Sequence, residues 1–251
     1  MIGELPRLRS RHGESTRLWA GDQVRIYPER WVALSGAAGV DYNVALCHGG
    51  GVHALTRTLE EILAAGAPAL MMVAGAALGE VHELVDRHWA CIGSAPFMAR
   101  RLEPGRLRSS RVRVAALDAS GLHLARTLIA EVFGLDEALA LVALPHDALA
   151  SEGRTVWAAL DSGGAIASCL VSVAVQDVVV IWSMATAISA RRQGYGAAVL
   201  QAALQDAAGR DTHTALLHSS TAGESFYRSA GFSELERWQL WSRPRWVLGR
   251  A

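Results

Sequence analysis

Short apolar runs alternate with helically spaced segments along the first hundred residues. Within 52–65, apolar side chains recur at Leu55, Leu59 and Ile62, a spacing that predicts an amphipathic helix. Gly66 follows directly, as expected at the end of a helix. The first thirty residues are polar and rich in arginine, so we expect a short lead-in segment that packs late. The other elements expected here are strands over 31–37, 43–47, 69–73, 91–92 and 98–102 and a helix over 78–89.

The second half of the chain repeats this alternation with longer apolar runs. Leu124 and Leu128 lie on one face of a predicted helix over 122–133. The apolar segments 155–160 and 165–175 flank the sequence DSGG, which predicts a β-hairpin because these residues tolerate the backbone angles of a tight turn. The remaining expected elements are strands over 112–117, 178–187, 214–218 and 232–241 and helices over 137–144, 197–208 and 224–229.

The order of these elements predicts an α/β fold class with mixed sheets, because strands and helices alternate in both halves. A length of 251 residues suits one large or two modest domains. Pro104, Gly105 and the serines at 109–110 are typical of a linker. We therefore expect a smaller domain over 1–105 and a larger one over 111–251.

The charge balance argues against one class of partner. Twenty-four basic residues cancel twenty-four acidic ones, whereas nucleic-acid binding needs a concentrated basic surface. Six arginines nevertheless crowd into a short stretch, which we interpret as a solvated linker, with an anion-binding patch as the alternative. These are Arg100, Arg101, Arg106, Arg108, Arg111 and Arg113.

Cysteine usage and the apolar runs bear on the compartment. Cys47, Cys91 and Cys169 are odd in number and widely spaced, which suits a reducing compartment and matches no common zinc signature. The N-terminus lacks the apolar core of a signal peptide, and the apolar runs are interrupted before they reach membrane-spanning length. We expect a cytoplasmic protein with no metal and no membrane partner.

The most informative segment is a glycine-containing junction between a strand and a helix. The apolar run 178–183 leads to residues 191–196, which read RRQGYG, and a helix follows at once. Such a junction directs several backbone N–H groups, and the positive end of a helix dipole, at one point. This predicts a phosphate or pyrophosphate site, with a tight turn as the alternative. The sequence matches neither G-x-G-x-x-G nor the G-K-[S/T] of a mononucleotide loop.

Residues 191–196 resemble the R/Q-x-x-G-x-G/A signature of the GNAT acyltransferases, which holds the coenzyme A pyrophosphate. Residues 222–232, AGESFYRSAGF, are similar to the last helix of that family and to the Gly-Phe pair that begins its final strand. The resemblance covers about 111–241. It implies a catalytic GNAT domain in the C-terminal half and, in tandem family members, a degenerate GNAT-like N-terminal half. The implied co-substrate is acetyl-CoA or another acyl-CoA.

The resemblance also implies where the co-substrate binds. The strand before the loop is expected to carry a bulge and to splay from its neighbour, with the pantetheine arm in the gap. A backbone N–H near Met184 or Ala185 is expected to polarise the thioester carbonyl. The implied cofactor-binding residues are Met184, Ala185, Thr186, Arg191, Arg192, Gln193, Gly194, Tyr195, Gly196 and Ala197.

The same resemblance supplies candidate catalytic residues. Tyr227 matches the family tyrosine that protonates the leaving thiolate, with packing of the helix as the alternative. The strand around Ser183 contains no carboxylate, which puts a direct carboxylate base in doubt, and Ser183 itself joins the catalytic candidates. His218 is our candidate base because an unperturbed imidazole has a pKa of about 6.5. Its alternative role is that of a satisfied histidine at a strand end.

Acceptor recognition is the least defined part of the sequence. Tyr42 and Asn43 lie between apolar runs and are candidate substrate-binding residues, with a backbone-bonded turn as the alternative. The glycines of 48–51 are a weaker candidate anion loop. We expect a small-molecule primary amine as acceptor and include a homodimer among the partners considered. The alternative functions are a GNAT-fold transferase with an aminoacyl or one-carbon donor and a non-catalytic acyl-CoA-binding module.

Overall fold

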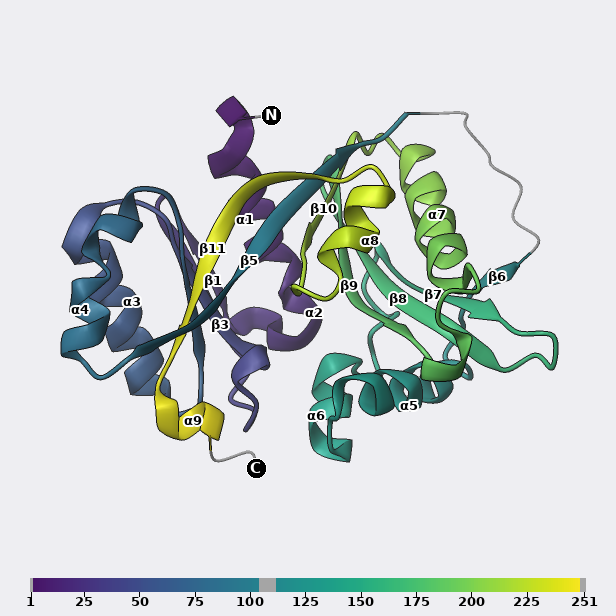
Figure 1. Cartoon of the computed structure of the whole chain (residues 1–251), viewed down its shortest axis with the longest axis horizontal. Coiled ribbons are helices and arrows are strands. Elements are labelled where there is room, and N and C mark those ends of the chain that lie inside the picture. The colour runs from purple at the N-terminus through teal and green to yellow at the C-terminus, as the bar shows by residue number, and fades with distance from the viewer. Residues whose placement is uncertain (1, 104–111, 249–251) are drawn as a thin grey trace. The chain divides into compact units, whose positions relative to one another are not determined.

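The computed structural model describes residues 2–103 and 112–248 (Figure 1). The chain forms two compact units. The first unit joins Met1–Met98 to His218–Ala251, and the second consists of Ala99–Leu217. The linker residues predicted at 104–110, together with Arg106, Arg108 and Arg111, lie outside the described residues. Mixed strands and helices occur in both units, which confirms the α/β fold class.

The first unit contains a mixed sheet in the order β1-β2-β3-β4-β11-β5. Its β1, β2 and β3 are antiparallel neighbours, β3 and β4 are parallel, and β11 is antiparallel to β4. The strands are β1 (Val24–Tyr27), β2 (Arg30–Leu34), β3 (Asn43–Cys47), β4 (Leu70–Val73), β5 (Ala90–Arg101, whose last residues enter the second unit) and β11 (Ser233–Ser242). The helices are α1 (Leu5–Ser15), α2 (Arg17–Ala20), α3 (Gly51–Ala65), α4 (His82–Asp86), α8 (Glu224–Ser229) and α9 (Pro244–Leu248), with 3-10 turns at Ile2–Glu4, Gly21–Gln23, Val40–Tyr42 and Gly75–Glu80.

The core of the first unit explains why the end of the chain belongs to it. Leu55, Leu59 and Ile62 of α3 are fully buried in one apolar cluster, as their spacing predicts. Trp241 of β11 lies in the same cluster, and β11 pairs with β4. The compact units therefore divide the chain differently from the consecutive domains 1–105 and 111–251, because the last strand returns to the N-terminal sheet.

The expectation of a late-packing lead-in is wrong. Residues Leu5–Ser15 form helix α1, which buries Leu8, Arg9 and His12. A Cβ at Gly13 would come within 2.6 Å of the Trp31 ring, so α1 lies directly against that indole. The buried positions carry arginine and histidine, and a hydropathy pattern therefore reads them as solvent-facing. Two further elements differ: the helix expected over 78–89 is a 3-10 turn followed by the short α4, and β5 is one continuous strand.

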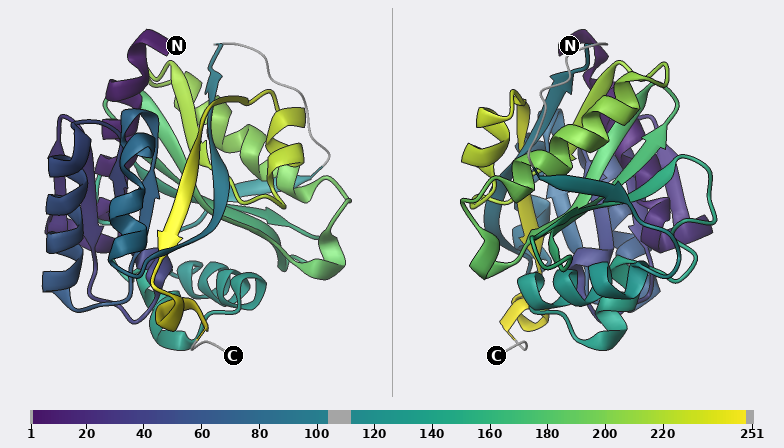
Figure 2. Two further views of the ribbon diagram at one scale, coloured as in Figure 1. Left: turned by 60° about the vertical axis from the view of Figure 1, so that its left-hand side comes forward. Right: turned by 90° about the vertical axis from the view of Figure 1, so that its right-hand side faces the viewer.

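The second unit contains the strands in the order β10-β9-β8-β7-β6, all antiparallel except the parallel pair β9 and β10. Helices α5 and α7 cover opposite faces of this sheet (Figure 2). The strands are β6 (Arg113–Ala116), β7 (Arg154–Leu160), β8 (Ile166–Val175), β9 (Val178–Thr186) and β10 (Thr214–His218, whose last residue belongs to the first unit). The helices are α5 (Leu122–Phe133), α6 (Glu137–Ala143) and α7 (Tyr195–Ala208), with a 3-10 turn at Ile188–Ala190.

The two units share an order of elements. In the first, antiparallel β1, β2 and β3 lead into α3 and then into β4, parallel to β3. In the second, antiparallel β7, β8 and β9 lead into α7 and then into β10, parallel to β9. Right-handed crossovers through a helix are the usual way to join parallel neighbours. The shared order is what two copies of one fold produce.

Candidate functional site

Strand β9 contains the bulge expected before the glycine loop. Its register with β8 pairs Cys169 with Ala185 but Val171 with Trp182, so β9 has one residue more than its partner. Ser183 lies at this bulge with φ of +49°, a left-handed conformation that is uncommon for serine. A bulge bends the strand and redirects its side chains. The candidate catalytic residue Ser183 is therefore at the point where β9 changes direction.

The register of β9 with its second neighbour, β10, ends just before the bulge. The parallel register with β10 runs from Val178 paired with Thr214 to Val180 paired with Leu216. Within the described residues no register continues from Ile181 onwards, although β9 extends to Thr186. An extended ligand can add to a strand where its pairing with a neighbour ends. Met184, Ala185 and Thr186 lie beyond the last residue of β9 that is in register with β10.

The glycine loop is open to solvent. Residues Arg191, Arg192, Gln193 and Gly194 are all exposed. Gly194 is the N-cap of α7 with φ of +88°, and a Cβ there would meet no atom within 4 Å. The side-chain Nε2 of Gln193 donates to the Ser189 carbonyl at 2.7 Å, which stabilises the turn. Gly194 thus has a left-handed backbone conformation that glycine adopts easily. The space beside its Cα is open.

The N-terminus of α7 supplies the N–H groups that the loop presents. The first N–H groups of a helix have no intrahelical acceptor, and no side chain caps this helix. Its first three residues are Tyr195, Gly196 and Ala197. Together with the helix dipole and the exposed guanidinium groups of Arg191 and Arg192, they form an anion-binding arrangement.

Tyr227 lies on α8 in the first unit. Its ring makes edge contacts with Phe226 and Phe232, with centroids 5.2 and 5.8 Å away. A Cβ at Gly223 would lie 3.2 Å from the tyrosine ring, so a glycine allows the ring to approach the turn before α8. Burial raises the pKa of the Tyr227 hydroxyl, which therefore stays protonated throughout the neutral range.

His218 lies in an aromatic cluster of the first unit. Its ring stacks on Trp238 at 4.8 Å and meets the edge of His12 at 6.3 Å. The Nε2 atom is enclosed and has no hydrogen-bond partner among the described residues. Burial lowers the pKa of His218 to about 4, an effect that a backbone hydrogen bond at Ala95 partly opposes. The imidazole is thus unprotonated at neutral pH, as a base must be, but it holds a proton weakly.

The structure gives Asn43 a role in shaping the chain. Its side chain accepts from the Gly36 N–H at 2.9 Å and donates to the carbonyls of Ala37, Gly39 and Pro68 at 2.7 to 3.1 Å. The residue is fully buried. These bonds use both the oxygen and the amide nitrogen, which favours the turn alternative over substrate binding.

Tyr42 and the glycine loop at 48–51 have different surroundings. The Tyr42 ring is partly exposed and meets the edge of Trp19 at 6.2 Å. Gly50 is the left-handed N-cap of α3, at the place in the first unit that Gly194 has in the second. The Glu29 carboxylate lies directly against Gly50, where a Cβ would otherwise be. The Glu29 side chain therefore occupies the space that a side chain at position 50 would need.

A buried polar network in the first unit was not found from the sequence. Arg9 contacts the Glu236 carboxylate through Nε at 2.7 Å and the His48 Nδ1 atom through Nη1 at 3.1 Å. The indole of Trp238 donates to the same carboxylate at 2.6 Å. Arg9 and Glu236 are 227 positions apart, so no local pattern relates them. Their pairing joins the first helix to the last strand.

Acid is expected to destabilise the first unit through its buried histidines. The pKa of His48 and that of His218 are both lowered from 6.5 to about 4, mainly by burial. As the pH falls, the unfolded chain therefore binds these protons before the folded chain does. The free energy of unfolding is fully retained above about pH 6.5. It falls between about pH 6.5 and 4, by about 1.4 kcal/mol per pH unit for each histidine. Urea unfolding at pH 7.5 and pH 5.0 measures the loss.

The matched variants for this experiment are His48→Gln and His53→Gln. His53 is exposed on α3, so its replacement controls for the removal of a histidine from the surface. His48→Gln should reduce the slope, because one proton fewer separates the two states. An equal slope in both variants would contradict the assignment.

Two further observations limit the chemistry within the described residues. No three His, Cys, Asp or Glu side chains in 2–103 and 112–248 gather in a way that could hold a metal ion. No helix described here is both long enough and apolar enough to cross a membrane.

Comparison with known proteins identifies the domain that contains these features. Residues 152–234 match the acetyltransferase (GNAT) domain family. The chain is similar to a solved GCN5-related N-acetyltransferase from Kribbella flavida, with 17% identity, a TM-score of 0.68 and 95% of each chain covered. It is also similar to one from Sphaerobacter thermophilus, with 15% identity, a TM-score of 0.64 and coverage of 97% of this chain and 94% of that one. No curated protein matches the chain. The chain thus carries a GNAT domain on a GNAT acyltransferase fold, as expected.

Proposed function

We propose that this chain, which carries a GNAT acetyltransferase domain, transfers an acyl group from acyl-CoA to the primary amine of a small molecule. Acetyl-CoA is the proposed donor. The observation that carries the proposal is the pairing of an open, left-handed Gly194 at the N-terminus of α7 with a bulged β9 whose register with β10 ends at Val180. The first feature suits a diphosphate and the second suits an extended pantetheine arm.

The proposed reaction follows from the groups that these elements provide. The amine nitrogen attacks the thioester carbonyl carbon, and a backbone N–H near Met184 or Ala185 stabilises the developing oxyanion. The carbon–sulphur bond then breaks, and the Tyr227 hydroxyl donates its proton to the leaving thiolate. The ammonium proton of the acceptor leaves to a base, for which His218 is the candidate, and Tyr227 is reprotonated from solvent.

A substitution in the loop tests the co-substrate. Gly194→Val forces a β-branched residue into φ of +88°, a conformation that costs about 1–2 kcal/mol per residue outside glycine. We expect the dissociation constant of acetyl-CoA to rise by about tenfold, since 1.4 kcal/mol corresponds to a factor of ten. Isothermal titration of the wild type and the variant with acetyl-CoA measures this change.

The matched control is Gly134→Val. Gly134 follows α5 in the same unit with φ of +64° and has the same empty surroundings, so the backbone strain is similar but remote from the loop. Unchanged affinity in Gly194→Val, or an equal loss in both variants, would argue against a pyrophosphate at this loop. Turnover of acetyl-CoA with a panel of small amines, followed by release of the free thiol, separates an enzyme from a module that only binds the thioester.

A further inference from the structure

Helix α8, which carries Tyr227, is short and only partly buried. It has only six residues, none of them fully buried, and no side chain caps its N-terminus. A helix of this length is unstable by itself, because the cost of its first turn is not recovered over so few hydrogen bonds. Its orientation must therefore be set by what it touches in the rest of the first unit.

The polar side of α8 is joined to β11 by four charged side chains, which we call the charge ring: Glu224, Arg228, Glu234 and Arg237. Arg228 donates to the Glu224 carboxylate through Nε at 3.0 Å and through Nη2 at 2.8 Å. The same Nη2 atom donates to Glu234 at 2.7 Å. One arginine of the helix thus reaches a carboxylate of the helix and a carboxylate of the strand.

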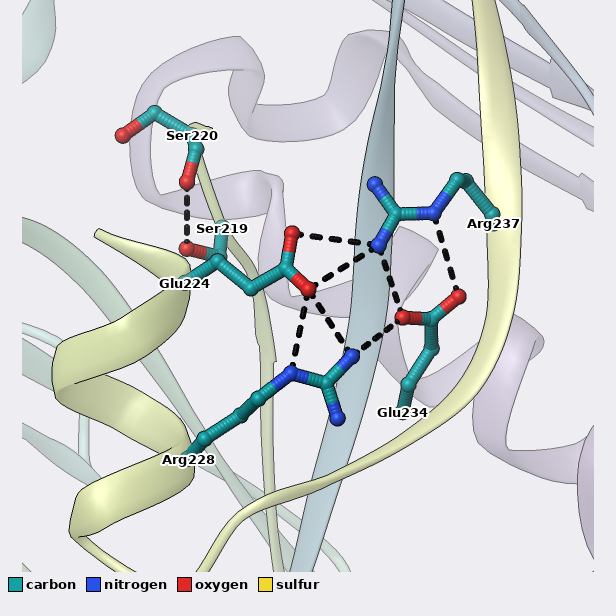
Figure 3. Close-up of polar contacts among 6 residues, drawn as sticks. All are labelled: Ser219, Ser220, Glu224, Arg228, Glu234 and Arg237. Atoms are coloured by element: carbon teal, nitrogen blue, oxygen red, sulfur yellow. Dashed lines mark hydrogen bonds and ion pairs between the residues drawn. The ribbon is translucent and has the colours of Figure 1, made fainter. Parts of the chain in front are cut away.

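Arg237 of β11 closes the ring from the opposite side. Its Nη2 atom lies 3.1 Å from both oxygens of Glu224 and 2.7 Å from Glu234. Its Nε donates to Glu234 at 3.2 Å. Figure 3 shows the two carboxylates facing the two guanidinium groups, so that positive and negative charges alternate around the ring. Each charge therefore has two neighbours of opposite sign.

The strand end of the ring is fixed to the core. Trp238, next to Arg237, is fully buried, and β11 continues into its pairing with β4. At the helix end, Arg228 follows Tyr227 directly in the chain. The ring therefore connects the buried part of β11 to the residue beside the proposed proton donor.

We propose that the charge ring positions Tyr227 for proton donation to the leaving thiolate. This inference rests on the proposed function, in which Tyr227 is the general acid. Exposed ion pairs contribute little one at a time, whereas a closed network of well-formed pairs contributes more. The four members are positioning residues, since they act on the reaction through α8.

The ring favours the charged forms of two of its members. Hydrogen bonds from Arg228 and then Arg237 lower the pKa of Glu224, and hydrogen bonds to Glu234 and then Glu224 raise the pKa of Arg237. Added salt and substitution are therefore the means of weakening the ring.

The test uses Arg237→Gln, with Arg237→Lys as the conservative variant. Glutamine removes the charge that closes the ring, whereas lysine keeps it without the planar fork. Because small misplacements of a catalytic group are costly, we expect Arg237→Gln to lower kcat by about tenfold, with an unchanged KM for acetyl-CoA and partial recovery in Arg237→Lys. Amide hydrogen exchange over 224–229 should become faster in Arg237→Gln.

Arg25→Gln is the matched control, because Arg25 forms an exposed ion pair with Glu61 in the same unit, outside α8 and β11. It should change neither kcat nor the exchange of α8.

The decisive comparison repeats Arg237→Gln in the Tyr227→Phe background, where the substitution should have no further effect on kcat. A tenfold loss in that background, or unchanged exchange in α8, would overturn the proposal. Absence of turnover in the wild type, together with faster exchange in Arg237→Gln, would count against the proposed function and the positioning role. It would still show that the charge ring holds α8 to β11.

Discussion

Replacing Tyr227 with phenylalanine is expected to lower kcat by about 10²–10⁴-fold, the usual contribution of a positioned general acid. The hydroxyl is the only group removed, and the ring keeps its contacts with Phe226 and Phe232. Binding of acetyl-CoA should therefore be retained, and the loss should lie in the step that breaks the carbon–sulphur bond. Steady-state kinetics with thiol release as the readout measure kcat, and titration measures binding.

The control for this variant is Tyr27→Phe. Tyr27 is an exposed tyrosine of β1 whose hydroxyl lies 3.5 Å from Glu61, and its replacement should leave kcat unchanged. Since burial raises the pKa of Tyr227, the wild-type rate should show no alkaline loss from this residue below about pH 10. A Tyr227→Phe enzyme as fast as the wild type would remove the tyrosine from the mechanism.

Replacing Arg9 with alanine is expected to destabilise the protein by about 3–5 kcal/mol, the cost of breaking a buried ion pair from one side. The side chains of Arg9 and Glu236 are only 8% and 13% exposed, so the carboxylate would be left in a low-dielectric environment without its partner. His48 would lose a hydrogen-bond partner in the same step. Urea unfolding of the variant at pH 7.5 measures the change in the free energy of unfolding.

Arg7→Ala on the same helix is the control for Arg9→Ala. Arg7 pairs with Glu4 at the surface, where the side chains are 34% and 46% exposed, and such pairs contribute about 0–1 kcal/mol. A loss of similar size in both variants would show that α1 responds to any arginine removal. A loss below about 1 kcal/mol for Arg9→Ala would show that its pairing with Glu236 is dispensable.

Local patterns in the sequence predict several elements of both units. The strand at 214–218 and the helices at 122–133 and 224–229 are observed at their expected bounds. In these segments the apolar spacing and the flanking turn residues point to the same structure. A local pattern also predicts the turn at 191–196, because its glycines lie directly between an apolar strand and a helix. Gly194 has the left-handed conformation that such a turn requires.

The parts that could not be predicted depend on contacts between distant residues. Arg9 reads as solvent-exposed until Glu236 is placed beside it, and the hydropathy of α1 gives no sign of this pairing. The return of β11 to β4 has the same origin, since Trp241 fits a core assembled near the start of the chain. The aromatic surroundings of His218 arise from the same long-range packing. The candidate role of Tyr227 came from the family resemblance and that of His218 from the ordinary pKa of an imidazole, whereas their burial and pKa shifts depend on the fold.

The Glu29 carboxylate beside Gly50 distinguishes the glycine loop of the first unit from that of the second. A loop that evolved around a diphosphate keeps unsatisfied amides, and binding of the ligand then adds to the stability of its fold. At Gly50 the Glu29 carboxylate occupies the space beside the backbone, whereas a Cβ at Gly194 would meet no atom within 4 Å. An anion that binds at the Gly194 loop is therefore expected to raise the stability of the second unit, and the loop at Gly50 has less room for such a ligand.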